Sequence, residues 1–422
     1  MKKRRWIILA GVTVLSGGLL WLFLAREPIQ EGRCRLARKK ADINSQLMGL
    51  AFYFIEPLDG KPDSVQDLPA GFDRPAYYQI KSADELIPMA LDFSSTGLRL
   101  CVDTDGDGVL SEEHYLTPKT VRATRESSEA QQFGPISLVP RDGDSRTGGE
   151  FYVKCYRTDA PAAVVTFSAF SYIGRLRLAG RTYRVAVVDG DCDGRFRSIL
   201  SLPLNRQWRV PSCDIFAIDL NGNGTFEISE HKRSEVMPLS RLVRIEDTYY
   251  ALDIAPDGRD LALSPTEPAL GTLMVEPNDI DMELRLWSDA ADQHLLFKRE
   301  QRLPAGKYKA IYAVMRKADA SGDVWVFSSG LDSAFTRLGP LEFFTIQQGE
   351  TTSIKIGPPF VVKADVQTSG SGRVSISPAV IGCAGEAYSA AFRQNQGRPS
   401  PIPFKIVDEK GTVLVADKFQ YG

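Results

Sequence analysis

The sequence predicts a mainly β protein, built from several β-sandwich or small-barrel units with Asp-rich loops behind one N-terminal transmembrane or signal helix. Short apolar runs rich in β-branched and aromatic residues alternate with turn residues along the chain, which is typical of strands. After the N-terminal segment, no long stretch keeps the 3.6-residue apolar period of an amphipathic helix. The length of 422 residues exceeds one ordinary core and indicates roughly two to four domains. We expect strands at residues 98–102, 183–188, 214–218, 250–254, 309–314 and 324–327.

The N-terminal segment is the stretch predicted to enter a membrane. Basic residues 2–5 precede residues 6–25, which carry no charge, and a helix of that length spans a bilayer core at about 1.5 Å per residue. We expect a retained anchor, because Phe23 stands where a signal peptidase that cut after Ala25 requires a small side chain. The body would then lie in the periplasm or outside the cell, anchored to the inner membrane. Secretion after cleavage is the alternative.

Clusters of Pro and Gly near residues 135–149, 265–278 and 357–359 mark the expected domain boundaries. In the C-terminal third, Leu303-Pro-Ala-Gly-Lys-Tyr308 is similar to the turn and strand of immunoglobulin-like or transthyretin-like sandwiches in exported bacterial proteins. The predicted segments are a signal-anchor at 1–32, a juxtamembrane linker at 33–50, β domains at 51–140 and 141–277, an immunoglobulin-like or transthyretin-like sandwich at 278–360, and a small β unit at 361–422.

The charge of the chain is distributed unevenly. Residues 1–40 contain ten Lys and Arg and two Glu, so the remainder carries 41 basic and 51 acidic side chains. An acidic body disfavours nucleic acid as a partner, because phosphate binding requires clustered cations that release counterions. Divalent cations suit this charge better.

The six cysteines are scattered and include no C-x-x-C pair, which leaves zinc and thioredoxin-type sites without support. Two interpretations stay open. The cysteines either form disulfides, with Cys192 and Cys213 as the best candidate pair, or are separate buried thiols.

Three segments share one spacing of oxygen-bearing side chains. Ligands at positions 1, 3 and 5 wrap around a hard cation, Gly at position 6 permits the sharp turn, and the residue at position 7 offers its carbonyl. The first two segments use Asp at all three positions, and the third uses one Asp and two Asn. The three sets are Asp103, Asp105 and Asp107, then Asp189, Asp191 and Asp193, then Asp219, Asn221 and Asn223.

The three segments differ in how many of the ligands of a cation they supply. The third is the most complete, with Thr225 at position 7, Glu227 at position 9 and Glu230 at position 12. The first has Val109 at position 7 but His114 at position 12, and the adjacent Glu112 and Glu113 leave its last ligand open. The second has Leu200 at position 12, so it lacks a terminal carboxylate unless another segment supplies one, and its expected affinity is lowest.

These segments resemble EF-hand calcium loops over about twelve residues each, with strands in place of the flanking helices. The pattern is similar to that of exported bacterial envelope proteins with such loops, and the resemblance implies Ca²⁺ as the bound ion. The alternative is that Asp, Asn and Gly simply form β-turns here. Residues 253–260 also contain several Asp and a Gly, but their spacing differs from that of the three segments, and we expect a hairpin turn there.

The chain contains no His-Glu-x-x-His, Gly-x-Ser-x-Gly or Gly-Lys-Ser/Thr motif, so no catalytic residue is nominated. The favoured hypothesis is a membrane-anchored, extracytoplasmic calcium-binding scaffold of the bacterial cell envelope. Its expected partners are calcium, the membrane, and another envelope protein or a polysaccharide. The alternative is an anchored envelope hydrolase, for example one acting on carbohydrate, with an unrecognised carboxylate site.

Overall fold

The computed structural model describes residues 31–418, except 43–44, 83–84, 95–96, 123–128, 139–148, 157–158, 202–212, 229–233, 277–279, 298–299, 321, 330–342, 369–373, 389, 394–402 and 408. Within these residues, the regular elements are strands and one 3₁₀ helix, Gln46–Gly49. The prediction of a mainly β protein with several sheets is therefore confirmed. Residues 1–30, which include the predicted span, lie outside the described residues. The described part of the chain contains no helix of the length and apolarity that crossing a membrane requires.

The first pair of sheets encloses its own core. Tyr78 and Met89 from one sheet and Phe133 and Phe151 from the other belong to the same buried cluster, and each is fully buried. The three-stranded sheet contains β4 (Pro75–Ser82), β5 (Glu85–Ser94) and β6 (Gly97–Val102); the five-stranded sheet contains, in order, β3 (Tyr53–Ile55), β10 (Val164–Ser168), β9 (Glu150–Cys155), β8 (Glu129–Ser137) and β7 (Lys119–Arg122).

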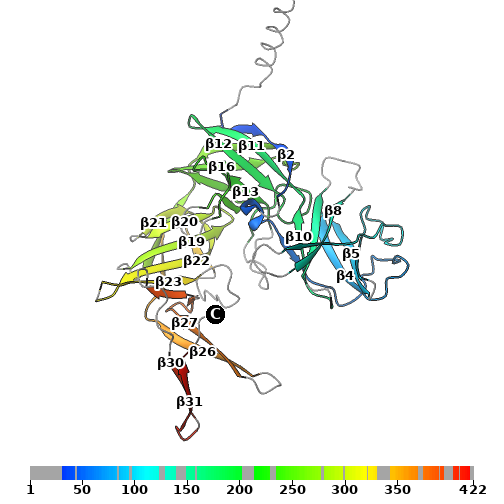
Figure 1. The fold of residues 1–422 in the computed structure, drawn as a ribbon. Helices are drawn as coiled ribbons and strands as arrows, with labels where there is room; N and C mark the ends of the chain where they lie inside the picture. Colours follow the sequence, from blue (N-terminus) through cyan, green and yellow to red (C-terminus); the bar gives the residue numbers. More distant parts are fainter. Residues whose placement is uncertain are drawn as a thin grey trace, which may run out of the picture.

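The second pair of sheets lies next to the first and also shares one core (Figure 1). Leu176, Val187 and Phe216 from one sheet meet Leu263 from the other. One sheet contains, in order, β14 (Val236–Pro238), β13 (Ile215–Ile218), β12 (Arg181–Val188), β11 (Phe170–Leu178) and β2 (Ala37–Lys40); the other contains β1 (Arg33–Arg35), β17 (Asp260–Thr266), β16 (Thr248–Ile254) and β15 (Leu242–Ile245).

The third pair of sheets follows, and two small sheets complete the chain. Leu284, Tyr308 and Ile354 lie in the third core. The third pair is formed by β21 (Glu300–Pro304), β18 (Leu270–Glu276) and β25 (Thr351–Lys355), and by β20 (Gln293–Phe297), β19 (Asp281–Ser288), β22 (Gly306–Ala318), β23 (Val324–Ser329), β29 (Ala390–Arg393) and β24 (Phe344–Ile346); the small sheets are β26 (Val361–Thr368) with β27 (Val374–Ile381) and β28 (Ala387–Tyr388), and β30 (Pro403–Val407) with β31 (Val413–Lys418).

All six strands predicted from the apolar runs are present, as parts of β6, β12, β13, β16, β22 and β23, except that β13 begins at Ile215, one residue after the predicted start. The hairpin turn expected at 253–260 joins β16 to β17, which pair antiparallel. Where the sequence predicts a linker at 33–50, the structure has β1 and β2 at the edges of two different sheets, followed by the 3₁₀ helix Gln46–Gly49. Leu36, between them, is buried in the second core, Cys34 packs against that core, and the two strands pair with β17 and β11, so this basic segment is part of the body.

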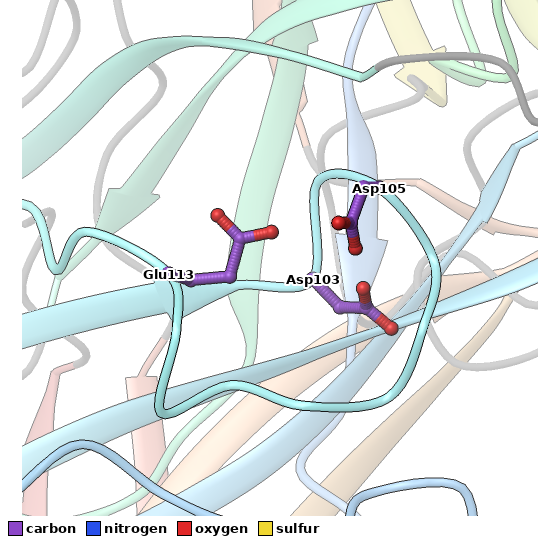
Figure 2. A group of neighbouring side chains, drawn as sticks. All are labelled: Asp103, Asp105 and Glu113. Atoms are coloured by element: carbon purple, nitrogen blue, oxygen red, sulfur yellow. The ribbon is translucent and has the colours of Figure 1, made fainter.

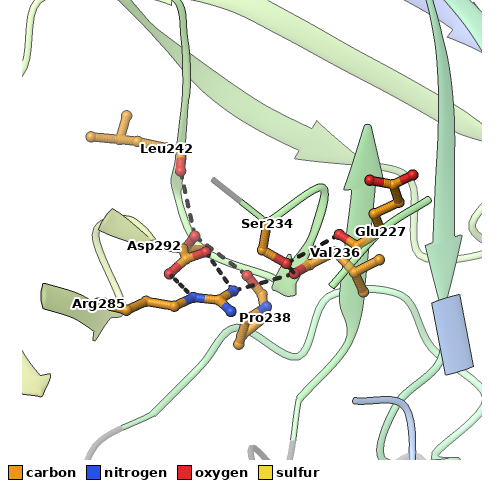
Figure 3. A network of polar contacts seen from close by, with 8 residues as sticks. Glu227, Ser234, Val236, Pro238, Leu242, Arg285 and Asp292 are labelled. Atoms are coloured by element: carbon orange, nitrogen blue, oxygen red, sulfur yellow. Dashed lines mark hydrogen bonds and ion pairs between the residues drawn. The ribbon is translucent and has the colours of Figure 1, made fainter. Parts of the chain in front are cut away.

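A buried polar network joins the second and third units (Figure 3). The guanidinium of Arg285, on β19, donates to Asp292 at 3.0 Å and to the carbonyl oxygen of Val236, on β14, at 3.3 Å. Both charged side chains are at most 8% exposed. Trp287, two residues along β19 from Arg285, is packed into the second core. The hydrogen bond from Arg285 to Val236 and the packing of Trp287 therefore link the third unit to the second.

Asp92 supplies the main charged contact of the first unit and yields a prediction. Its carboxylate accepts hydrogen bonds from the amide N–H of Asp73 at 3.1 Å and Arg74 at 2.8 Å, and pairs with Arg99 at 2.7 Å. Burial raises the pKa of Asp92, but these contacts outweigh burial and hold the pKa below its ordinary value.

We expect Asp92→Asn to destabilise the fold by about 2 kcal/mol at neutral pH, because charged hydrogen bonds are lost. Since the folded pKa is depressed, the contribution of Asp92 is present above the unfolded pKa and disappears as the pH falls through the folded pKa. Chemical denaturation of the variant and the wild type between pH 7 and pH 2 checks this. The exposed Asp63→Asn is the control, and a constant difference in stability at all pH values would contradict the assignment.

Candidate metal centres

Each Asp-rich loop begins at the end of a strand, as the sequence predicts. β6 ends at Val102, directly before Asp103; β12 ends at Val188, directly before Asp189; and β13 ends at Ile218, directly before Asp219. A strand fixes the backbone position of the first ligand, so the three loops start from equivalent points.

The three loops have the same internal hydrogen bonds. At position 6, the amide N–H of Gly108, Gly194 and Gly224 donates to the Oδ2 of Asp103, Asp189 and Asp219, each at 2.9 Å. At position 7, the amide N–H donates to the Oδ1 of the side chain at position 5, at 2.7 to 2.8 Å. The side chains at positions 1 and 5 are thereby fixed on the inside of each loop.

The backbone conformation also repeats. The residue at position 4 has a left-handed φ of 77°, 60° and 75° in the three loops, and the glycine at position 6 has 84°, 81° and 82°. Position 4 is Gly in the first and third loops but Cys192 in the second. A non-glycine residue with positive φ costs of order 1 kcal/mol or more, so the second loop adopts this shape against a local cost.

A carboxylate from outside the first five positions contacts each loop, and of these three acids the sequence indicates only Glu113. The amide N–H of position 2 donates to it: Thr104 to Glu113 at 2.6 Å, Gly190 to Asp214 at 3.3 Å, and Leu220 to Glu235 at 2.8 Å.

The signal in the sequence is the place of this carboxylate on the returning chain. Asp214 directly precedes β13, which pairs with β12, and Glu235 directly precedes β14, which pairs with β13. Glu113 shortly precedes Leu116, which bridges back to Leu100 on β6. Each acid therefore sits just before the point where the chain returns to the strand that leads into its loop.

The first loop brings Asp103, Asp105 and Glu113 together (Figure 2). One carboxylate oxygen from each lies within 4.8 Å of the others, so the group could hold a metal ion. Asp103 is 1% exposed, and its Oδ1 has no hydrogen-bond partner in the described part of the chain. Burial, with added repulsion from Asp107 and Asp105, raises its pKa.

The second loop forms the more deeply buried group, from Asp189, Asp191 and Asp214, with the same spacing of ligand atoms. Asp189 and Asp214 are 2% and 0% exposed. Burial and the neighbouring carboxylates raise the pKa of both well above the ordinary value. Burial and Asp191 also raise the pKa of Asp193 to about 6. The terminal carboxylate that this loop lacks in sequence is therefore supplied by Asp214.

The third loop is arranged differently. The buried carboxylate of Glu235 accepts hydrogen bonds from the amide N–H of Leu220, Asn221 and Glu227. The Nδ2 of Asn223 donates to Glu227 at 2.7 Å, and the hydroxyl of Thr225 donates to Asn223 at 2.7 Å. Glu230, its predicted terminal ligand, lies outside the described residues, so the expectation that this loop is the most complete stays a prediction.

All six cysteines are free thiols, so the disulfide between Cys192 and Cys213 is not formed and the interpretation as separate thiols holds. Burial and nearby carboxylates raise the pKa of both thiols well above the ordinary value. Since the thiolate is the nucleophilic and metal-binding form, neither sulfur is a reactive group.

The two acidic groups contain oxygen ligands alone, which suits a hard cation such as Ca²⁺ or Mg²⁺ rather than zinc or copper. No Lys or Arg among the described residues forms an ion pair with any of these six carboxylates. Comparisons with protein-family models, curated proteins and solved structures find no match. The interpretation therefore rests on the chemistry of the sites.

The position-6 glycines give a matched pair of substitutions. A Cβ added at Gly108 would lie 2.3 Å from the carbonyl oxygen of Ser64, whereas one added at Gly224 meets nothing within 4 Å. We expect Gly224→Ala to cost about 1–2 kcal/mol, from the left-handed φ alone. Gly108→Ala should cost distinctly more, because backbone must also move. Differential scanning calorimetry of both variants checks this, and equal losses would show that the first loop does not pack against residue 64 as described.

Proposed function

We propose that this protein is an extracytoplasmic, membrane-anchored scaffold of the bacterial cell envelope whose loops are fixed by bound Ca²⁺. The observation that carries the proposal is the grouping of the buried Asp189 and Asp214 with the half-buried Asp191, where no Lys or Arg of the described residues forms an ion pair with them. Like charges in a low-dielectric site repel strongly. A divalent cation relieves that repulsion and converts the group into a stabilising contact.

Calcium fits these loops better than magnesium. Ca²⁺ takes six to eight oxygen ligands in flexible geometry, while Mg²⁺ requires near-ideal octahedral geometry and retains water. Each loop presents side-chain oxygens at positions 1, 3 and 5, one additional carboxylate, and a carbonyl at position 7, from Val109 in the first loop and Arg195 in the second. Weak sites of this kind are filled at the calcium concentrations found outside the cytosol, which agrees with the predicted export.

The second site would act as a clip between two units. Cys192, at position 4 of the loop, is buried in the core of the first pair of sheets, while Phe196, at position 8, is buried in the core of the second. A cation held by Asp189, Asp191 and Asp214 fixes the segment that crosses from one core to the other. A rigid multi-unit body is what a scaffold needs to present a surface to another envelope protein or a polysaccharide.

The first site would fix a connection within the first unit. The amide N–H of Gln66 donates to the carbonyl oxygen of Gly108 at 2.9 Å, so the loop holds residues 64–66, where Val65 is buried. That segment has no regular secondary structure of its own. Ordering the loop with a cation therefore also orders the adjacent polypeptide, which is a structural role rather than a catalytic one.

Thermal unfolding of the full-length protein in detergent tests the proposal, with calcium, with magnesium and with a chelator. A ligand present at 100 times its Kd stabilises by about 2.7 kcal/mol, so we expect calcium to raise the Tm by several degrees and magnesium to raise it less. The same Tm in calcium and in chelator would overturn the proposed calcium dependence.

Asp191→Asn should change the stability of the protein in opposite directions with and without calcium. The Oδ1 of Asp191 is buried and accepts no hydrogen bond from the described residues, and without calcium the charge of Asp191 raises the cost of ionising Asp189 and Asp214. We expect the variant to be more stable than the wild type in chelator and less stable in calcium. The exposed Asp253→Asn, on β16, is the control. A variant less stable under both conditions would show that Asp191 is structural and not a ligand.

A further inference from the structure

Exposed basic side chains gather where the chain enters the body. Five of them, which we call the basic face, are Arg33, Arg35, Lys39, Lys40 and Arg175; all are exposed. None forms an ion pair with another described residue. Two acidic side chains near them are engaged elsewhere, since Glu31 pairs with Arg177 at 3.7 Å and Glu150 pairs with Arg38, while the exposed Asp260 lies opposite Arg35 in the pairing of β1 with β17.

The strand pairing places these residues side by side. The amide N–H of Gly32, just before β1, donates to the carbonyl oxygen of Arg177 on β11 at 2.8 Å. β2 then pairs with the other end of β11, from Ala37 opposite Ile173 to Lys40 opposite Phe170. Arg175 lies on β11 between these two contacts. The basic face therefore follows one edge of the second unit, at the end of the molecule opposite β30 and β31 (Figure 1).

We propose that this basic face rests on the anionic phospholipid headgroups of the membrane in which the predicted anchor is embedded. The proposal depends on the anchor in the proposed function and is independent of calcium. The uncharged segment ends at Ala25 and β1 begins at Arg33, so an extended connection reaches at most about 28 Å. The first folded residues of the body therefore stay within that distance of the bilayer surface, and an unextended connection brings them closer.

Electrostatics favour this contact over a freely suspended body. Each Lys or Arg near an anionic membrane surface strengthens binding by about fivefold, and the attraction decays over about 8 Å at physiological ionic strength. The tether keeps the face near the surface, so association is effectively intramolecular. The acidic character of the rest of the body directs the other faces away from the membrane.

Lysine labelling of the full-length protein in nanodiscs tests the proposal. We expect an uncharged acylating reagent to modify Lys39 and Lys40 severalfold more slowly in discs containing phosphatidylglycerol than in discs of phosphatidylcholine alone, and high salt to remove the difference. The triple substitution Arg33→Gln, Arg35→Gln and Arg175→Gln should restore fast labelling of both lysines. The control substitutes the same number of exposed cations far from this edge, Lys363→Gln, Lys405→Gln and Lys418→Gln, and should leave the slow labelling unchanged.

Three results would overturn the proposal. Equal labelling of Lys39 and Lys40 in both kinds of disc would show that the face does not contact lipid. Fast labelling of Lys39 and Lys40 in the control variant as well would show that the protection depends on the net charge of the protein and not on the basic face. Protection by inorganic phosphate in neutral discs would assign the face to a soluble anion instead of a lipid headgroup. Calcium-dependent unfolding is measured separately, so a failure here leaves the calcium sites standing, and the reverse also holds.

Discussion

Repulsion between buried carboxylates is the constraint on which the central part of this structure depends. Asp189 and Asp214 lie at the shared boundary of the first two units, and both are almost completely buried. Backbone N–H groups supply some of the hydrogen bonds that the buried carboxylates require, since Gly194 donates to Asp189 and Ser198 donates to Asp214. Neutral donors reduce the cost of burying charge but leave the mutual repulsion. Protonation, which the raised pKa values of Asp189 and Asp214 favour, removes the buried charge, and a cation held between these carboxylates would offset it without a loss of charge on the acids.

The β architecture brings these acids together across long stretches of sequence. Val188, at the end of β12, is paired with Ile215, at the start of β13. The residues just beyond this pair are Asp189 and Asp214, so antiparallel pairing places them opposite each other although they are 25 positions apart in sequence. The same logic applies to Glu235 before β14 and, through the bridge between Leu100 and Leu116, to Glu113. Strand pairing, and not the loop alone, therefore builds each site.

These contacts explain which parts of the molecule could be predicted from its sequence. Apolar runs such as residues 183–188 are local signals, and the strands follow them. The loop ligands at positions 1, 3 and 5 are also local. Asp214 could not be assigned, because its role depends on the register of β12 with β13, which is a long-range property. The edge strands β1 and β2 were equally hidden, since basic residues dominate their composition and only Leu36 indicates burial.

The third loop shows why completeness in sequence and dependence on a cation are different properties. Its positions 3 and 5 carry neutral Asn221 and Asn223 in place of Asp, and Glu235 is satisfied by three backbone N–H groups. The described part of this loop therefore contains less unbalanced charge than the second loop does. Ser234, next to Glu235, donates to the carbonyl oxygen of Val236, which also accepts from Arg285 in the joint to the third unit (Figure 3). A loop that supports a joint between units gains from being ordered by hydrogen bonds that do not depend on the cation concentration outside the protein.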